Sequence, residues 1–395
     1  MLPLNKAPSW VYPGAKYDLD FANSRYWGGT AYRGQSTGNN AAASLLTELN
    51  GGASANSFYS PDASGILQTF PQYGLRITSG MGLWVEGNYT NYALWCRDLT
   101  NAAWTKTNIT ATKNQTGADG KASAATSLTA SSSNGTCLQS ITQSSTIFVG
   151  SAYVKRISGT GTISMTIDGG STYTDITSQL NSSNYTKVAV ASQTLANPSI
   201  GFKIGTSGDA IAVDFVQCEN NSYATTPMLT TSASLGRGAE ATFYMGDGTG
   251  NPNNAGQQLI RDIDNGTPAT VLIQYSGNFS KQHLLHGDAI SAMFVTGPAS
   301  GGTIAYNSAT TANSENFGLG SINKAIWRVD GTGSGICLNG GAIATSSTKV
   351  GAYSDPSHGG LGNRGIGDYP IDGYIVRVSY WRKALTDGEM IRLST

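Results

Sequence analysis

The chain has 395 residues, of which 12% are charged and 50 are glycine, and its formal net charge is zero. This length allows two or three domains that each bury a core. The balanced charge, without a run of Lys or Arg, excludes the basic surface that nucleic-acid binding needs. Abundant Gly, Ser, Thr and Asn disfavour long helices and favour short strands joined by tight turns.

The N-terminal sequence predicts a protein made in a cytoplasm and not inserted in a membrane. It reads MLPLNKAPSWVYPG, which lacks the basic start and apolar core of a signal peptide. No apolar run approaches the ~18 residues of a membrane span. The cysteines lie far apart without a CxxC pair, so we expect isolated buried thiols at Cys96, Cys137, Cys218 and Cys337.

Residues 1–85 form an N-terminal segment of mixed structure. Strands are expected in KYDLDFA, GILQTF and GLRITSG, and a short helix in AAASLLTELNGG, where the glycine pair is a helix stop. The sequence leaves open whether these strands complete a C-terminal sandwich. If they do, the middle of the chain is an insertion.

Residues 86–235 have an almost purely β pattern. Short strands are expected in SLTAS, STIFVGSAYVKRI, TISMTI, TYTDIT, KVAVASQTL, SIGFKIG and DAIAVDFVQCE. Asp168-Gly169-Gly170-Ser171 separates TISMTI from TYTDIT and predicts a hairpin, because glycine accepts positive φ. Strands at this spacing predict a β-sandwich.

Residues 236–395 are expected to form a second β-sandwich. Strand signals occur in ATFYMG, TPATVLIQYS, ISAMFVTG, GTIAYNS and KAIWRVDG, and again in YIVRVSYW, whose imperfect alternation suits a strand buried on both sides or one with a bulge. Thr386 and Glu389 have the spacing of a capping box, so a short C-terminal helix is expected. The predicted fold class is therefore all-β, with two jelly-roll or β-sandwich domains.

Two stretches carry a family resemblance. TNYALWCRDLTNAAW and the closing VQCENNSYATTPM resemble the two ends of a carbohydrate-binding-module-like jelly roll common in tailed-phage structural proteins. The tail, WRVDGTGSGICLNGG followed by DGYIVRVSYWRKALTDGEM, is similar to laminin-G-like or concanavalin-A-like jelly rolls. These resemblances leave the first 85 residues less explained.

The resemblance implies a component of a tailed phage or phage-like particle. It implies a fibre, spike or decoration protein in the virion, a homo-oligomer that contacts other virion proteins and binds host surface polysaccharide. The implied N-terminal role is attachment to the virion. An alternative is a structural decoration or adaptor protein that contacts only other virion proteins, because both jelly-roll types also serve structural roles.

Catalytic patterns are not supported, so we expect no enzyme. A retaining glycosidase needs two carboxylates about 5 Å apart, and the E-x-D-x-E type of pattern is absent. Asp262 and Asp264 are interpreted as turn residues beside Asn265-Gly266. His283 and His286 lie three apart between β runs, where that spacing does not favour a metal pair.

We expect no cofactor, with a structural calcium ion as the single alternative. Jelly-roll modules often hold such an ion between carboxylates and carbonyls. Asp98, Asp214 and Glu219 are the available weak candidates, and a plain surface carboxylate is the favoured interpretation of each.

Carbohydrate binding needs aromatic faces beside polar groups. Trp84, Trp95 and Trp104 lie within 21 residues, but we expect them to pack where two domains join. Aromatic residues in polar, glycine-rich loops are better candidates. The predicted binding residues are Tyr173, Tyr353, His358, Asn363, Arg364, Asp368 and Tyr369.

Overall fold

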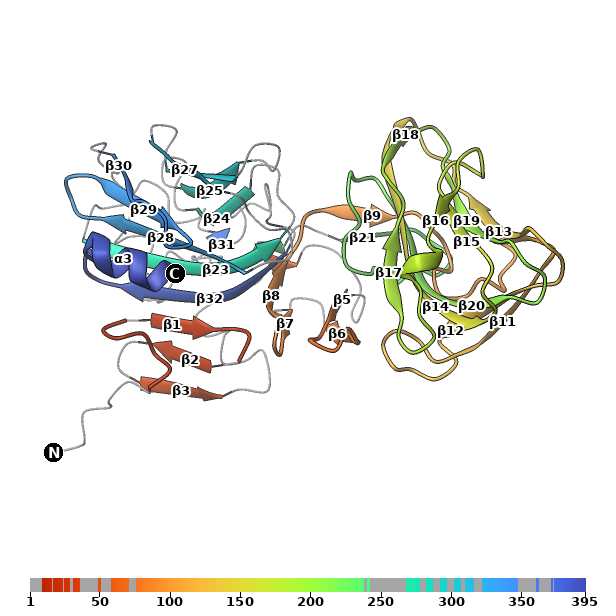
Figure 1. Ribbon diagram of the computed structural model, residues 1–395, viewed down its shortest axis with the longest axis horizontal. Coiled ribbons are helices and arrows are strands. Elements are labelled where there is room, and N and C mark those ends of the chain that lie inside the picture. Colours follow the sequence, from red (N-terminus) through yellow and green to blue (C-terminus); the bar gives the residue numbers. More distant parts are fainter. Residues whose placement is uncertain are drawn as a thin grey trace. The chain divides into compact units, whose positions relative to one another are not determined.

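The computed structural model describes part of the chain (Figure 1). The described residues are 9–15, 17–23, 25–28, 31–35, 49–50, 58–70, 76–237, 240–241, 268–277, 282–286, 292–296, 302–306, 310–315, 322–346, 360–361, 371 and 373–395. Strands dominate them, which confirms the all-β fold class. Among these residues no helix is long and apolar enough to cross a membrane.

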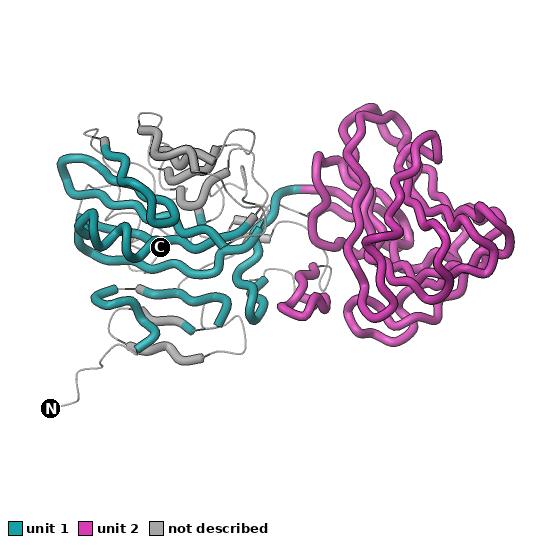
Figure 2. The backbone as a smooth tube through the Cα atoms, viewed as in Figure 1, with its two compact units in different colours: residues 1–51, 73–88, 238–395 teal, residues 52–72, 89–237 magenta. Residues whose placement is uncertain are grey.

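The chain divides into two compact units, shown in different colours in Figure 2. Unit 1 contains residues 1–51, 73–88 and 238–395. Unit 2 contains residues 52–72 and 89–237. Each unit is therefore built from segments that are not consecutive in sequence.

Unit 1 is organised around a 10-stranded sheet. Its order is β3-β2-β1-β32-β23-β28-β29-β30, and β8 pairs with both β32 and β7. The bounds are β1 Tyr17–Asp20, β2 Arg25–Gly28, β3 Ala31–Gln35, β7 Ile77–Thr78, β8 Gly82–Val85, β23 Ala269–Gly277, β28 Asn323–Val329, β29 Ser334–Leu338, β30 Ala344–Ser346 and β32 Gly373–Trp381.

Unit 1 also contains a five-stranded sheet of order β27-β26-β25-β24-β31 and the two-stranded pair β22-β4. Their bounds are β4 Leu49–Asn50, β22 Glu240–Ala241, β24 Gln282–His286, β25 Ala292–Thr296, β26 Gly302–Tyr306, β27 Thr310–Glu315 and β31 Gly360–Leu361. Leu49 and Asn50 fall in the stretch expected to be helical, and they pair with β22 as a strand.

N-terminal strands complete the main sheet of unit 1. Strand β1 pairs with β32, with Tyr17 opposite Tyr380, and β8 pairs with the other end of β32, with Trp84 opposite Tyr374. Strand β32 has a bulge at Val376 and is mostly buried, so both expectations for its imperfect alternation apply.

Helix α3, Asp387–Ser394, follows the last strand, as expected. The Thr386 side chain accepts a hydrogen bond from the Glu389 backbone N–H, and the Glu389 side chain accepts one from the Thr386 backbone N–H. This confirms the capping box, which satisfies helix N–H groups that have no partner within the helix. Met390 of α3 is buried with Leu272, Ile326 and Trp381 in the core of unit 1.

Unit 2 is a β-sandwich. Its five-stranded sheet has the order β10-β13-β19-β15-β16, and its eight-stranded sheet has the order β11-β12-β20-β14-β17, with β18, β9 and β21 attached. The bounds are β9 Tyr89–Asn91, β10 Thr105–Thr107, β11 Ile109–Gln115, β12 Ala125–Ala130, β13 Gly135–Ser140, β14 Thr146–Ser158, β15 Ile163–Thr166, β16 Thr174–Asp175, β17 Thr186–Ala189, β18 Gln193–Leu195, β19 Ser199–Ile204, β20 Ala210–Glu219 and β21 Leu235–Arg237; a 3-10 turn, η1, covers Thr177–Gln179.

Alternating apolar residues from the two sheets form one core in unit 2. Met165 and Phe202 come from the five-stranded sheet, and Leu128, Val154 and Val213 come from the eight-stranded sheet. All five are fully buried. The hairpin expected at Asp168 is confirmed, because β15 and β16 pair antiparallel.

A short hairpin from the N-terminal part of the chain belongs to unit 2. Its strands are β5, Phe58–Pro61, and β6, Leu67–Phe70. The Tyr59 ring lies 4.6 Å from the Phe215 ring, and the Leu67 N–H donates to the Ala118 carbonyl. The two units therefore do not coincide with the consecutive ranges 1–85, 86–235 and 236–395, because residues 52–72 pack with the middle of the chain.

Candidate binding face

Only one predicted carbohydrate-binding residue lies among the described residues. Tyr173 lies in the loop between β15 and β16. The others lie outside the described residues: Tyr353, His358, Asn363, Arg364, Asp368 and Tyr369. Asp262 and Asp264 also lie outside them, and His283 and His286 are in strand β24.

The outer face of the five-stranded sheet presents small hydroxyl side chains. Cys137 and Phe202 lie in the core, so their neighbours along β13 and β19 point outward. Residues paired across neighbouring strands lie on the same face. We call the outward residues of β10, β13 and β19 the hydroxyl face: Thr105, Thr107, Thr136, Leu138, Ser140, Ser199, Gly201 and Lys203.

The hydroxyl face is accessible. Thr105, Thr107 and Ser140 are exposed, and Thr136 and Lys203 are half-buried. At its centre Gly201 has no side chain, and a Cβ there would meet the Cys137 carbonyl oxygen at 2.1 Å and the Leu138 side chain at 2.7 Å. Leu138 therefore lies over Gly201 and supplies an apolar contact among hydroxyl groups.

The loop from Asp168 to Tyr173 borders this face. An Asp168 carboxylate oxygen accepts hydrogen bonds from the Thr166 hydroxyl at 2.8 Å and the Thr172 N–H at 2.9 Å. Burial opposes ionisation, but these hydrogen bonds hold the pKa of Asp168 below its usual value. Gly169 and Gly170 have φ of 75° and 96°, which allows the tight path of the loop.

Tyr173 lies at the border of the hydroxyl face, and its ring is not free to serve as a flat platform for a sugar ring. The Lys203 ammonium lies 4.1 Å from the centre of the Tyr173 ring, a cation–π contact. Gly170 packs against the hydroxyl end of the same ring, because a Cβ on Gly170 would come within 2.7 Å of that hydroxyl. The half-buried ring therefore offers a ligand its remaining surface beside a held ammonium group.

The outer face of the eight-stranded sheet is covered by the chain itself. Every residue of its strand β20 is buried. Tyr59 and Leu67 of the hairpin pack there with Ala118, Tyr153 and Phe215. The Phe58 backbone also forms a bridge to Met228. A ligand therefore has no open access to this face at β20.

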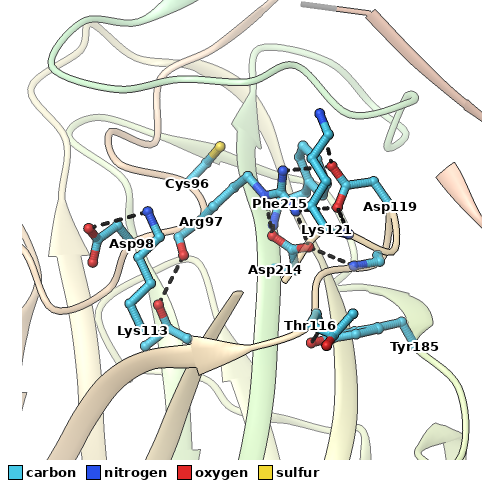
Figure 3. A network of polar contacts seen from close by, with 12 residues as sticks. Cys96, Arg97, Asp98, Lys113, Thr116, Asp119, Lys121, Tyr185, Asp214 and Phe215 are labelled. Carbon is cyan, nitrogen blue, oxygen red and sulfur yellow. Dashed lines mark hydrogen bonds and ion pairs between the residues drawn. The ribbon is translucent and has the colours of Figure 1, made fainter. Parts of the chain in front are cut away.

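A bulge in β20 creates a buried ionic network under this cover (Figure 3). Phe215 has φ of 46°, and the register against β14 shifts there. Asp214 and Phe215 consequently both lie on the outer side. The Arg97 guanidinium donates to both Asp214 oxygens at 2.7 and 2.9 Å and lies 4.1 Å over the Phe215 ring.

Asp119 is the second carboxylate partner of Arg97. Two guanidinium nitrogens donate to its oxygens at 2.8 and 2.7 Å. Burial raises the pKa of Asp214, whereas at Asp119 the ion pair with Arg97 outweighs burial and lowers the pKa. The network links three separate segments of unit 2, so we interpret its role as structural.

The three calcium candidates do not converge. Asp214 pairs with Arg97, and Asp98 accepts from the Thr100 hydroxyl at 2.6 Å and lies 3.5 Å from the Lys113 ammonium. Glu219 accepts from the Thr225 N–H and the Gln217 amide, each at 3.1 Å. Within the described ranges, no group of three His, Cys, Asp or Glu residues is placed to hold a metal ion.

The three tryptophans occupy different environments. Trp104 is 1% exposed and donates from its indole to the Leu94 carbonyl at 3.1 Å. Trp95 is half-buried against the core of unit 2. The Trp84 ring lies 5.4 Å from the Tyr374 ring within unit 1. Their role at a domain junction stays a prediction.

Sequence reasoning missed Arg97 and Lys203. A signal for Arg97 existed, because Asp214 lies inside the apolar run AVDFV and a fully buried carboxylate almost always has a partner. No comparable local signal marks Lys203. Its importance arises from the loop that brings Tyr173 over it.

Comparisons with known proteins show only a limited likeness. No family model matches the chain, and no curated protein is similar to it in sequence. A solved structure of the Ruminococcus gnavus IT-sialidase CBM40 bound to alpha2,6 sialyllactose is 18% identical, with a TM-score of 0.28, and the match covers 36% of this chain and 89% of that one.

Two further solved structures have similar scores. Domain 4 of AbnA, a GH43 extracellular arabinanase from Geobacillus stearothermophilus, in complex with arabinotriose, is 15% identical with a TM-score of 0.27, covering 33% of this chain and 67% of that one. Trypanosoma rangeli sialidase with the inhibitor DANA is 13% identical with a TM-score of 0.27, covering 33% and 23%. Likeness at this level says nothing about what this chain binds.

Proposed function

We propose that this protein is a non-enzymatic virion surface protein, a head or tail fibre or spike, that binds host surface polysaccharide through the hydroxyl face. The observation that carries the binding proposal is the contrast between the two sheets of unit 2. One outer face is accessible and lined by Ser and Thr, and the other is covered by the chain's own segments.

The chemistry of the face suits a sugar chain. Each Ser or Thr hydroxyl both donates and accepts hydrogen bonds, as sugar hydroxyls do. Leu138 and the edge of Tyr173 offer apolar contact for the C–H faces of a sugar ring. A shallow face of this kind binds weakly, so many copies on one particle or oligomer supply the avidity.

Polysaccharide binding is tested by blocking the face. Thr136→Met places a longer, uncharged side chain beside Lys203 on the hydroxyl face, whereas Thr110→Met places the same side chain on an exposed position of β11. We expect Thr136→Met to weaken polysaccharide binding about tenfold or more, and Thr110→Met to leave it unchanged, in a binding assay with immobilised host polysaccharide. Equal binding by both variants would remove the hydroxyl face as the site.

The virion role is supported by the resemblance of residues 86–235 to a jelly roll common in tailed-phage structural proteins, next to a domain, residues 236–395, that resembles laminin-G-like or concanavalin-A-like jelly rolls. Particles without the protein are expected to adsorb poorly to host cells. Particles that adsorb normally but lose physical stability would instead favour the structural decoration role. A fall in the viscosity of the polysaccharide during incubation with the protein would contradict the non-enzymatic assignment.

A further inference from the structure

The Lys and Arg side chains of residues 89–237 differ in the kind of group that they contact. Most have oxygen partners: Arg97 with Asp119 and Asp214, Lys106 with the carbonyls of residues 99–101, Lys113 with Asp98, Lys121 with Asp119, Arg156 with Asp209 and the Gly161 carbonyl, Lys187 with the carbonyls of Ala224 and Thr225, and Arg237 with the hydroxyls of Thr225 and Thr226. Within that fully described range, Lys155 and Lys203 instead contact tyrosine rings.

Lys203 is the one of these two lysines that lies on the hydroxyl face. Its ammonium is held 4.1 Å from the Tyr173 ring centre, and none of the described carboxylates forms an ion pair with it. An ammonium has three donors, and a ring face satisfies the charge on one side only. The remaining donors of Lys203 are therefore available beside the Ser and Thr hydroxyls.

Two carboxylates near this position do not neutralise Lys203 directly. Lys203 is paired with Ser164 of β15, and Ser164 is paired on its other side with Asp175 of β16. The Asp175 backbone is therefore two strands, or about 10 Å, from the Lys203 backbone. The Asp175 carboxylate accepts a hydrogen bond from the Thr177 N–H at 2.8 Å and has no ion pair with Lys203 among the described residues. Asp168 has an oxygen already engaged by Thr166 and Thr172.

We infer that the hydroxyl face selects acidic sugars, and that the Lys203 ammonium binds the carboxylate of a sugar acid. This inference rests on the proposed polysaccharide binding at the same face. A charge-assisted hydrogen bond is stronger than one between neutral groups, so a single ordered ammonium is enough to favour a carboxylate over its ester. Tyr173 positions the lysine, and the Ser and Thr residues contact the sugar hydroxyls.

The test uses the full chain and pairs of polymers that differ only in charge. Polygalacturonate and hyaluronate are compared with their methyl-esterified forms, and binding is measured at low and high salt. Lys203→Met is the test variant, and Lys155→Met, which removes the other ring-held lysine, is the matched control. Lys203→Arg keeps the charge and checks that loss of binding does not come from misfolding.

We expect the wild-type chain to bind at least one carboxylate polymer about tenfold more tightly than its ester. Salt should reduce this preference, Lys203→Met should abolish it, and Lys155→Met and Lys203→Arg should keep it. Equal binding of acid and ester, or a preference that survives Lys203→Met, would overturn the inference while leaving polysaccharide binding intact. Failure to bind these polymers or the host polysaccharide would overturn both proposals.

Discussion

Arg97 shows how a single residue decides the role of its neighbours. Asp214 is a plausible calcium ligand when only the local sequence is considered, but both of its oxygens accept from Arg97. Burying an ion pair costs desolvation energy. Removing only one partner of a buried pair destabilises the fold more strongly, because the remaining buried charge then has no partner. At the hydroxyl face, Tyr173 in the same way fixes the role of Lys203, by holding its ammonium in a cation–π contact.

Arg97→Met is expected to destabilise unit 2 by about 3–5 kcal/mol. The variant leaves Asp214, which is 0% exposed, and Asp119 without their guanidinium. Urea denaturation measures the loss. Lys121→Met is the control, because Lys121 is exposed and lies 3.6 Å from Asp119, so its loss should cost less than about 1 kcal/mol. Similar effects from both variants would contradict the structural role of Arg97.

The buried cysteines predict a loss of stability in alkali. Burial raises the pKa of Cys96 to about 11 and of Cys137 to about 12. An unfolded thiol ionises near pH 8.5, so above about pH 8.5 the unfolded chain loses protons that the folded chain keeps. The contribution of these two thiols to stability should therefore be constant below that pH, and stability should fall as pH rises from about 8.5 to 11.

Denaturation midpoints across this pH range measure the effect. Cys96→Ala with Cys137→Ala should flatten the alkaline slope even though it lowers stability at neutral pH. An unchanged slope would mean that other groups cause the alkaline loss. The native thiols should also react with a thiol reagent at pH 8 only as the protein unfolds.

At the scale of elements, local signals and long-range packing contribute separately. The capping box of α3 and the glycines of the Asp168 loop were predictable, because they depend on residues within four positions of each other. The bulge at Phe215 was not, because it exists only relative to the register of β14.

Two substitutions in helix α3 are expected to change the stability of unit 1 in opposite directions. Gly388 lies in its first turn with open space around the position of a Cβ, so Gly388→Ala should stabilise unit 1 by up to about 1 kcal/mol. Thr386→Ala removes the capping side chain and should destabilise it by about 1 kcal/mol. Thermal unfolding followed by circular dichroism compares the two. A loss of stability from Gly388→Ala would contradict the open space around this position.

At the scale of the whole molecule, both units are assembled from separated segments. Strand β1 belongs beside β32, more than 350 residues later, and the hairpin 58–70 belongs to unit 2. Such an arrangement predicts that a fragment starting after residue 75 lacks part of the packing of unit 2.

Tyr59→Ala tests the contribution of this hairpin in the full chain. Tyr59 is 1% exposed and packs on Phe215, so its truncation should cost unit 2 about 3–5 kcal/mol. Calorimetry is expected to show a lower transition temperature for unit 2 and an unchanged transition for unit 1. A shift of both transitions by the same amount would mean that the units unfold together.

By itself the sequence determined the features that depend on near neighbours. Composition and alternation specify an all-β chain, the Asp168-Gly169-Gly170 run specifies a hairpin, and Thr386 with Glu389 specifies a helix start. Only the tertiary structure decided which strands pair and which charges meet. Strand alternation tells which face a residue occupies but not which distant strand lies beside it, so the Arg97 network and the Lys203–Tyr173 pair emerged only from the folded chain.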